Sequence, residues 1–541
     1  MRYGFAIDTR SCIGCHACST ACKSENQVPL GVNRTWVRYT ETGRFPDTRR
    51  SFQVSRCNHC DNPPCARICP VSAMYRRNDG IVEFDADVCI GCKGCLQACP
   101  YDAIYVDPDT GTAAKCHFCG HRVSQGLEPA CVVVCPTHSI LAGDLDDPKS
   151  EIARFLAKND STVRKPEQGT APKLFYVSGT DVSLTPTALD RPSIGMMTDV
   201  LDAQGRLTQE PYQEGARYEV RLRFDGEETA QGLPSGGPIA IAGNAAGQMI
   251  AQTGYTAFHK APWHWQVPAY LVTKAVGAGA LGIGAVATLL RWSTPTTRLT
   301  ADLVGIVGLL ATTVLLVSDL ERPERFLRIL TRPQWRSWLT RGAFLLVALS
   351  IVATGALGLD LYQVWSGVSG SHAPNPGLET AFAALLLPLS ASVAAYTAFL
   401  FAQCEGRDLW QSPLLPVQLL ARAAAMGGAV LTPLLTVFDP ANADLARGVA
   451  VGALAADLLM LTFEVLTPHP SETAARALRA ITRGKWRSWA LFSVAAHALA
   501  IALLVVGVSP ALSVPAALAA LAGLYAWEHA FVAAPQEVPN S

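Results

Sequence analysis

Cysteine is almost absent from the last three quarters of this 541-residue chain. Sixteen of its 17 cysteines lie between Cys12 and Cys135, and Cys404 stands alone. Long apolar runs have the opposite distribution, because nearly all of them follow Val267. A chain of this length also exceeds one ordinary domain. Together these distributions predict at least two domains with different chemistry.

Basic stripes and an export signal are also lacking. The formal net charge is zero, and neither half carries a basic stripe interleaved with aromatic residues, so nucleic acid is not an expected partner. The first residues, MRYGFAIDTRSCIGC, contain no apolar signal-peptide stretch and no twin arginine, so we expect no cleavable export signal. That expectation argues against a disulfide framework, which needs an oxidising compartment.

The sixteen cysteines fall into four runs of four. Runs one and three have the spacing C-x2-C-x2-C-x3-C, run two widens one gap to four residues, and run four widens it to eleven. Such a run suits a [4Fe–4S] cluster because three thiolates from one loop reach three irons, while the fourth can cross to a second cluster. Zinc sites normally use two C-x2-C pairs without the C-x3-C-P ending that three of these runs show. The runs are Cys12, Cys15, Cys18 and Cys22; Cys57, Cys60, Cys65 and Cys69; Cys89, Cys92, Cys95 and Cys99; and Cys116, Cys119, Cys131 and Cys135.

On these runs, residues 1–165 resemble the four-cluster ferredoxin subunit of molybdopterin oxidoreductases of the dimethyl-sulfoxide, polysulfide and formate type. The resemblance implies a duplicated two-[4Fe–4S] ferredoxin domain in which runs one and four share two clusters and runs two and three share two more. It therefore implies four [4Fe–4S] clusters. The implied ligand sets are Cys12, Cys15, Cys18 and Cys135; Cys22, Cys116, Cys119 and Cys131; Cys57, Cys60, Cys65 and Cys99; and Cys69, Cys89, Cys92 and Cys95.

The remainder of the chain divides into a polar segment and an apolar domain. Residues 166–260 are rich in Gly, Pro, Thr and Gln, and we interpret them as a linker or docking segment, although KLFYVSG and ARYEVRLRF alternate like short strands. Residues 261–541 contain eight apolar stretches, each near the about 20 residues that cross a bilayer. The expected spans are 266–290, 299–318, 342–361, 378–402, 412–436, 446–466, 488–508 and 510–533. The predicted fold class is thus α+β, with the duplicated ferredoxin domain followed by an eight-helix transmembrane α-bundle.

Two similar segments lie at matching points among the predicted spans. TRPQWRSW (331–338) and TRGKWRSW (482–489) precede spans three and seven, which predicts two related four-helix bundles. The pieces WHWQVPAYLVTKAVGAGA, SDLERPERF, AAYTAFLF and FVAAPQEVP resemble the polysulfide-reductase (NrfD-like) membrane subunit. That resemblance implies eight spans and electron exchange with ubiquinone or menaquinone. No heme is expected, because only His497 lies well inside a span.

The loops between spans carry an asymmetric charge. Twelve Arg and Lys residues lie in loops on the face that the N-terminal domain shares, against three on the opposite face. The positive-inside rule therefore places the iron–sulfur domain in the cytoplasm, with the spans in a bacterial inner (cell) membrane and in contact with its lipid. The twelve are Arg322, Arg325, Arg328, Arg332, Arg336, Arg341, Arg407, Arg476, Arg479, Arg483, Lys485 and Arg487; the three are Arg291, Arg298 and Arg447.

Polar residues at the predicted cytoplasmic ends of the spans form a candidate quinone site. We expect His264 and Asp319 to exchange protons and Tyr396 to bind a quinone oxygen. The other candidates at this face are Tyr270, Glu464, Glu528 and His529. Helix ends also carry polar residues that only meet headgroups and water, and this simpler interpretation stays open for each of them.

Four charged or titratable residues lie deeper, about 12–15 Å from the same face at 1.5 Å per residue. They are Lys274, Arg422, Asp457 and His497. A charge at such depth costs about 2.5–3.5 kcal/mol on insertion scales, so these groups usually pair or line a path. We expect an Arg422–Asp457 pair with His497 nearby, and Lys274 as a counterpart in the first bundle. A static pair and a proton route are both open.

These observations predict an electron-transfer and membrane-anchor subunit of a respiratory molybdopterin oxidoreductase. Its catalytic partner would be a separate molybdenum or tungsten subunit, because nothing in this sequence binds that cofactor, and whether the protein counts as an enzyme stays open. Two other classes stay open as well. One is a subunit of a quinol-oxidising, proton-translocating or hydrogenase-linked complex without molybdenum, and the other is a ferredoxin-fused transporter or redox sensor.

Overall fold

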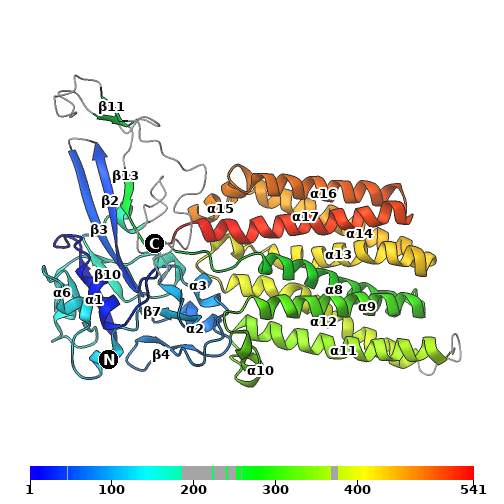
Figure 1. The fold of residues 1–541 in the computed structure, drawn as a ribbon, viewed down its shortest axis with the longest axis horizontal. Coiled ribbons are helices and arrows are strands. Elements are labelled where there is room, and N and C mark those ends of the chain that lie inside the picture. The colour runs from blue at the N-terminus through cyan, green and yellow to red at the C-terminus, as the bar shows by residue number, and fades with distance from the viewer. Residues whose placement is uncertain are drawn as a thin grey trace.

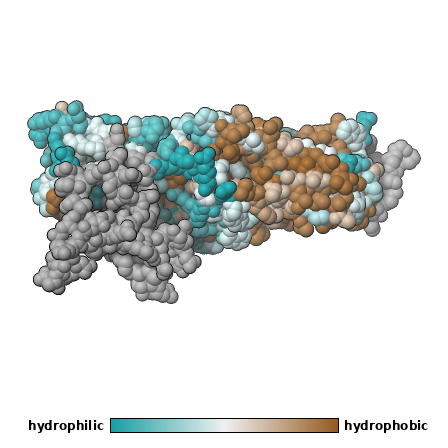
Figure 2. All heavy atoms as spheres, turned by 90° about the horizontal axis from the view of Figure 1, so that it is seen from above, coloured by the Kyte–Doolittle hydropathy of each residue, from teal (hydrophilic) through white to brown (hydrophobic). Residues whose placement is uncertain are grey.

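The computed structural model describes residues 1–44, 47–185, 222–224, 239–241, 251–257, 259–366 and 376–540. A strand-containing N-terminal unit lies at one end of a long bundle of helices (Figure 1). The described residues end at Asn540, back at the place where the two parts meet. Figure 2 shows hydrophobic residues over the surface of the helical part and hydrophilic ones over the described surface of the N-terminal unit. The α+β fold class is confirmed.

A four-stranded sheet of order β8-β1-β10-β9 forms the base of the N-terminal unit. The strand β1 (Tyr3–Asp8) pairs antiparallel with β8 (Ile140–Asp144) and parallel with β10 (Leu174–Val177), and β9 (Ser161–Thr162) pairs with β10. Both edges of β1 are therefore paired, which a strand with four buried residues in succession requires. Ser150 caps the covering helix α6 (Glu151–Lys158) by accepting a hydrogen bond from the Ala153 N–H.

The predicted boundary at residue 165 falls inside this sheet. The segment KLFYVSG, which alternates like a strand, supplies β10, because the open edge of β1 needs a hydrogen-bonding partner. A later strand, β13 (Ala251–Tyr255), also returns to the unit and pairs with β2 (Thr35–Arg44). We therefore place the end of the first unit after Val177, with part of the expected linker built into it.

The rest of the N-terminal unit consists of hairpins and short helices that alternate with the cysteine runs. The hairpins pair β2 with β3 (Asp47–Arg56), β4 (Met74–Arg76) with β5 (Val82–Phe84), and β6 (Ile104–Asp107) with β7 (Thr112–Lys115). The short helices are α1 (Ala17–Glu25), α2 (Pro64–Ile68), α3 (Gly94–Ala98), α4 (Gly120–Val123) and α5 (Ala130–Val133), with the turn α7 (Asp181–Leu184) following β10.

Eight described helices are long and apolar enough to cross a membrane, which confirms the eight predicted spans. They are α8 (Gln266–Leu289), α9 (Pro295–Ser318), α11 (Trp338–Ser366), α12 (Pro376–Ala402), α13 (Leu415–Phe438), α14 (Pro440–Leu466), α16 (Arg487–Val506) and α17 (Pro510–Glu537). Two shorter helices, α10 (Arg328–Thr331) and α15 (Glu472–Thr482), lie in the loops after α9 and α14.

Helix α8 lies between the two groups of helices and packs against both. It contacts α9 and α12 on one side, and α13 and α17 on the other. Gly279 makes the contact with α13 possible, since a Cβ atom there would lie 1.8 Å from the Ala423 carbonyl oxygen. A residue of α8 can therefore touch groups from both bundles, and this matters for Tyr270 and Lys274.

Candidate cluster sites and the junction with the membrane domain

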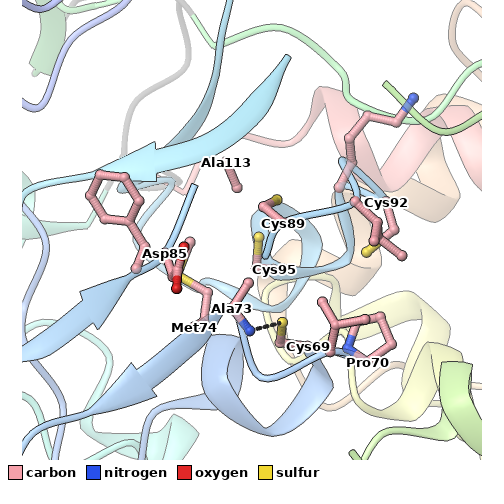
Figure 3. A pocket seen from close by; sticks show the side chains of 13 residues that line it. Cys69, Pro70, Ala73, Met74, Asp85, Cys89, Cys92, Cys95 and Ala113 are labelled. Carbon is pink, nitrogen blue, oxygen red and sulfur yellow. Dashed lines mark hydrogen bonds between the residues drawn. The ribbon is translucent and has the colours of Figure 1, made fainter. Parts of the chain in front are cut away.

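The structure gathers the sixteen cysteines into four quartets, each with three members from one run and one from another. Three quartets line separate cavities, and Figure 3 shows the one that contains Cys69 and Cys92. The fourth quartet is recognised by the electrostatic contacts of Cys60 with its three companions. We name them the distal quartet (Cys12, Cys15, Cys18, Cys135), the second (Cys22, Cys116, Cys119, Cys131), the third (Cys57, Cys60, Cys65, Cys99) and the proximal (Cys69, Cys89, Cys92, Cys95). These are the sets that the family resemblance implies.

One backbone feature shapes all four runs. The residue just before the second cysteine has a left-handed conformation in each, with φ of 69° at Gly14, 44° at His59, 69° at Gly91 and 61° at Phe118. This turn bends each loop back on itself and lets successive cysteines face one centre. In two runs a non-glycine residue accepts the conformation, which costs of order 1–3 kcal/mol and persists only where the surroundings impose it. The repeat at equivalent positions supports a common origin for the runs.

The quartets fit a bound cluster. Burial raises the pKa of the Cys18, Cys22 and Cys99 thiols to about 11, so four thiolates share one cavity only where positive charge is bound. Among the described residues, no three His, Cys, Asp or Glu side chains lie close enough to hold a single metal ion. A cluster of four irons keeps its thiolates farther apart than one zinc ion does.

Hydrogen-bond donors also point at the sulfur atoms. The Ala73 N–H donates to Cys69 Sγ at 3.2 Å (Figure 3), and Arg56 Nη1 donates to Cys131 Sγ at 2.8 Å. Such bonds stabilise thiolates and, through them, metal coordination.

Contacts between quartets give their spatial order. Cys18 of the distal quartet has Cys131 of the second as an electrostatic neighbour. Cys116 of the second is likewise a neighbour of Cys57 in the third, and Cys95 of the proximal quartet is a neighbour of Cys65. The quartets therefore form one series. Cys15 is solvent-exposed at its distal end.

The proximal quartet lies against the membrane domain. Trp263 Nε1 donates to the Cys92 carbonyl at 3.3 Å, and Lys93 Nζ lies 3.2 Å from Asp319 Oδ1. Burial raises the pKa of Asp319 to about 6, although the Lys93 ammonium opposes the shift. Partial burial, followed by the charge of Lys93, lowers the pKa of His264 beside it. Two of the three predicted catalytic residues thus flank one lysine beside Cys92.

The two predicted tyrosines lie directly deeper. Tyr270 and Tyr396 are both 4% exposed, and Tyr270 has Asp319 and Tyr396 as electrostatic neighbours. The Tyr396 ring occupies space that a Cβ at Gly342 would fill, and Lys274 Nζ lies 4.9 Å from the ring centroid. Lys274 also bonds the Thr397 hydroxyl. The structure therefore brings His264, Asp319, Tyr270 and Tyr396 into one region.

The other predicted residues at this face lie elsewhere. Glu464 accepts a 2.7 Å hydrogen bond from Gln418 Nε2, and Glu528 pairs with Arg422 at 2.9 Å. His529 stacks on Trp489 with ring centroids 4.5 Å apart. Each of these groups belongs to the second bundle, and of the three only Glu528 is an electrostatic neighbour of Tyr270.

The deep set has more members than the sequence indicated. Arg422 Nε pairs with Asp457 Oδ1 at 2.9 Å, and both side chains are 2% exposed. His497 Nδ1 donates to the Ser493 carbonyl at 2.8 Å, and His497 has Asp457 as an electrostatic neighbour. Glu528 on α17 completes a network with Arg422 that no spacing in the sequence could have revealed.

Two regions of this chain match known protein families. Residues 48–145 match the 4Fe-4S dicluster domain family, and residues 255–535 match "Polysulphide reductase, NrfD", which is more than half of the chain. This protein belongs to the NrfD polysulphide reductase family. It is a multi-pass membrane subunit of that family with an iron–sulfur electron-transfer domain at its N-terminal end.

The N-terminal domain of this NrfD-family protein also has curated relatives of its own. A tetrathionate reductase subunit of Salmonella typhimurium is 45% identical over 189 residues, which cover 34% of this chain and 76% of the relative. A polysulfide reductase chain of Wolinella succinogenes is 46% identical over 179 residues, which cover 32% of this chain and 94% of the relative. Protein NrfC of Escherichia coli is 44% identical over 180 residues, or 33% of this chain and 81% of the relative.

The quartets generate a prediction about ligand sharing. Cys95 and Cys99 belong to one run but to different quartets. Cys99→Ser and Cys57→Ser should therefore weaken the same electron paramagnetic resonance (EPR) signal, and Cys95→Ser should weaken a different one. Each variant should lose about a quarter of the bound iron if each quartet holds one [4Fe–4S] cluster. Cys404→Ser is the matched control, because this buried thiol lies outside every quartet. Loss of one common signal in Cys95→Ser and Cys99→Ser would contradict the pairing.

Proposed function

We propose that this protein is the electron-transfer and membrane-anchor subunit of a respiratory molybdopterin oxidoreductase. It would pass electrons between a separate catalytic subunit and membrane quinone through four [4Fe–4S] clusters. The observation that carries the proposal is the unbroken series of quartets from exposed Cys15 to Cys92, which contacts the start of the membrane domain. When bound, each cluster takes up and releases one electron at a time.

The quinone site proposed here lies where that series ends. Quinone reduction consumes two electrons and two protons, and quinol oxidation releases them. His264 and Asp319 flank Lys93, and we assign them to proton exchange, with Tyr396 and Tyr270 as hydrogen-bond donors to a quinone oxygen. Ubiquinone and menaquinone share the oxygen pair that these groups would bind. Electrons would reach the quinone without a heme, as expected from the sequence, in which only His497 lies well inside a span.

The catalytic partner would dock at the opposite end of the series. Seven large apolar side chains are exposed in the described part of residues 1–185, and five of them lie within eight residues along the chain of a cysteine of the distal or second quartet. Exposed apolar residues of this kind favour a protein interface there. The five are Ile13, Leu30, Leu127, Val133 and Val134. Curated relatives are named as parts of tetrathionate and polysulfide reductases, which supports a separate catalytic partner, and we propose that this partner holds molybdenum or tungsten. Purification from the native membrane, followed by identification of the co-purifying subunit and its metal, tests this assignment.

Four of the loop arginines also bind the N-terminal unit, and this affects the charge count on which the membrane orientation rests. Arg322, Arg325 and Arg328 donate to backbone carbonyls of the N-terminal unit, and Arg407 pairs with Asp102. These four have a docking role that is independent of membrane topology. The remaining basic residues still number eight against three, so the positive-inside rule keeps its direction. We propose an inner-membrane protein whose iron–sulfur domain faces the cytoplasm.

A second group of buried residues suits proton transfer. Arg422 pairs with Asp457 and Glu528. Glu464, which accepts a hydrogen bond from Gln418, is an electrostatic neighbour of the same arginine, so three carboxyl groups lie near one arginine. An uncompensated buried charge costs several kcal/mol, so we propose that at least one carboxyl holds a proton. Lys274 connects this network to the quinone region, because it neighbours both Glu528 and Tyr396. His497 lies at its edge, beside Asp457.

Asp319→Asn removes the proposed proton-exchanging carboxylate and leaves an amide of the same shape. We expect quinone-coupled turnover to fall by about 100-fold or more, the usual size of a lost acid–base group, with cluster spectra unchanged. Rates of cluster reoxidation by a soluble quinone measure the effect. Glu324→Gln in the same loop is the control, because that carboxylate is exposed and its partner is Arg322 at 3.4 Å. Full turnover in Asp319→Asn would remove this residue from the site.

Asp457→Asn tests the second-bundle network separately. If the network supplies protons, proton uptake measured with a pH dye in reconstituted vesicles should slow about 10-fold or more while electrons still reach the clusters. Asp360→Asn serves as control, since Asp360 is also buried and pairs with Arg298 at 2.9 Å in the first bundle. Equal proton uptake in the two variants would assign Arg422 and Asp457 to a static ion pair.

Orientation is tested with single reporter thiols in the Cys404→Ser background. Arg483 and Arg291 are exposed in loops on opposite sides of the bundle. A membrane-impermeant maleimide added to intact spheroplasts should label Arg291→Cys and leave Arg483→Cys unlabelled. Labelling should reverse in inverted vesicles. The opposite pattern would place the iron–sulfur domain outside the cytoplasm.

A further inference from the structure

The second quartet is surrounded by buried positive charge. Arg56 is 1% exposed and donates to Cys131 Sγ at 2.8 Å, while Cys18 of the distal quartet is its neighbour on the other side. Lys115 is fully buried, donates to the Cys116 carbonyl at 3.0 Å, and neighbours Cys57 and Cys65 of the third quartet. The two cations therefore lie between successive quartets, and the second quartet has one on each side.

A third cation reaches the same quartet from the segment that enters β2. Arg34 lines the cavity of the second quartet and has Cys22 and Cys116 as electrostatic neighbours. It is 9% exposed, and its Nε donates to the Tyr105 hydroxyl at 3.0 Å. Asn26 adds a weak donor, with its Nδ2 3.6 Å from Cys22 Sγ.

These three cations lack the carboxylate partners that buried cations usually have. In the described part of the chain, none of Arg34, Arg56 and Lys115 lies within 4.0 Å of a carboxylate oxygen. Lys93 beside the proximal quartet differs, because it pairs with Asp319 at 3.2 Å and Glu321 at 3.5 Å. Of the nearest acids, Glu25 pairs with His121 and Arg122. Glu83 lies 3.7 Å from Arg77 and is also an electrostatic neighbour of Lys115 and Arg34, at more than ion-pair distance from both.

Two further atoms show that the region is built for an acceptor. Arg56 Nε and Nη2 are buried and have no hydrogen-bond partner among the described protein groups. Buried N–H groups almost always find an acceptor, and an unpaired one costs about 1–3 kcal/mol. Arg56 lies between the distal and second quartets, and the sulfur atoms of the clusters bound there would be acceptors of the right kind.

We propose that Arg34, Arg56 and Lys115 give the second cluster the highest reduction potential of the series. A cluster gains one negative charge when it is reduced, and unpaired cations in a medium of low dielectric favour that form. The other clusters have fewer unpaired cations beside them. The distal and third clusters each border one of the three, and Lys93 beside the proximal cluster is neutralised by carboxylates. The second cluster then stores one electron while the two-electron partners at the ends of the series react. This inference rests on the proposed iron–sulfur function and is independent of the quinone assignment.

Redox titration of the purified complex, followed by EPR, tests the proposal without quinone. The signal with the highest midpoint potential should be the one that Cys119→Ser removes, since Cys119 belongs to the second quartet. Lys115→Met should lower the ratio of reduced to oxidised second cluster at fixed potential about tenfold, which is 59 mV for a one-electron couple. Lys115→Arg, which keeps the charge, should restore the wild-type value.

The matched control is Lys173→Met, because Lys173 is 2% exposed and is neutralised by Asp61 at 3.0 Å. It should leave every midpoint potential unchanged. Arg34→Gln provides a second test from the other side of the quartet, in case Lys115→Met loses iron. The proposal is overturned if the highest-potential signal survives in Cys119→Ser, or if Arg34→Gln and Lys115→Met shift no potential. A failure of quinone to reoxidise the wild-type clusters would refute the quinone assignment and leave this result intact.

Discussion

The loop of run three is hydrogen-bonded to the membrane domain through its backbone carbonyls, and the rest of the structure depends on that contact. Arg325 donates to the Cys89 carbonyl, Trp263 to that of Cys92, and the Gly406 N–H to that of Gln97. The donors come from the loop after α9, the segment before α8 and the loop after α12. A carbonyl buried without a partner costs about 1–3 kcal/mol, so all three segments must stay in place together. The proximal quartet is thereby fixed over the start of α8, where Asp319 and His264 lie.

Buried cations have three kinds of partner in the described residues, and some, such as Arg38 and Arg164, donate to backbone carbonyls. Where a cation has a carboxylate beside it, as Lys173 does in the N-terminal unit and Arg422 does in the second bundle, the pair accounts for its burial. Arg56 and Lys115 form no ion pair with a carboxylate, and their neighbours include cysteine sulfurs, which would carry negative charge with a cluster bound. Under the proposed function, these two cations would lie where negative charge accumulates during electron transfer.

Helix α8 links these two regions. Its close approach to α13 at Gly279 lets Tyr270 and Lys274, one turn apart, touch groups of both bundles. Asp319, Tyr270, Tyr396, Lys274 and Glu528 consequently form a continuous series of titratable groups from the junction into the second bundle. Under the proposed function, electrons would reach that junction from one side, and the series of titratable groups extends from the other.

The eight spans could be predicted without any structure, because about 20 apolar residues in succession have few alternatives to a membrane helix. Spacing also indicated the cluster chemistry of the cysteines, and the family resemblance implied sharing between runs that matches the quartets. Which charges meet depends on tertiary structure alone. Asp319 pairs with Lys93, 226 residues away, and Glu528 pairs with Arg422 in the second bundle. Packing also brings KLFYVSG to the edge of β1, where it completes the four-stranded sheet. It likewise brings the loop arginines to backbone carbonyls of the N-terminal unit. Periodicity and spacing report the environment of a residue along its own segment, whereas these contacts arise from segments far apart in the chain, and only packing brings them together.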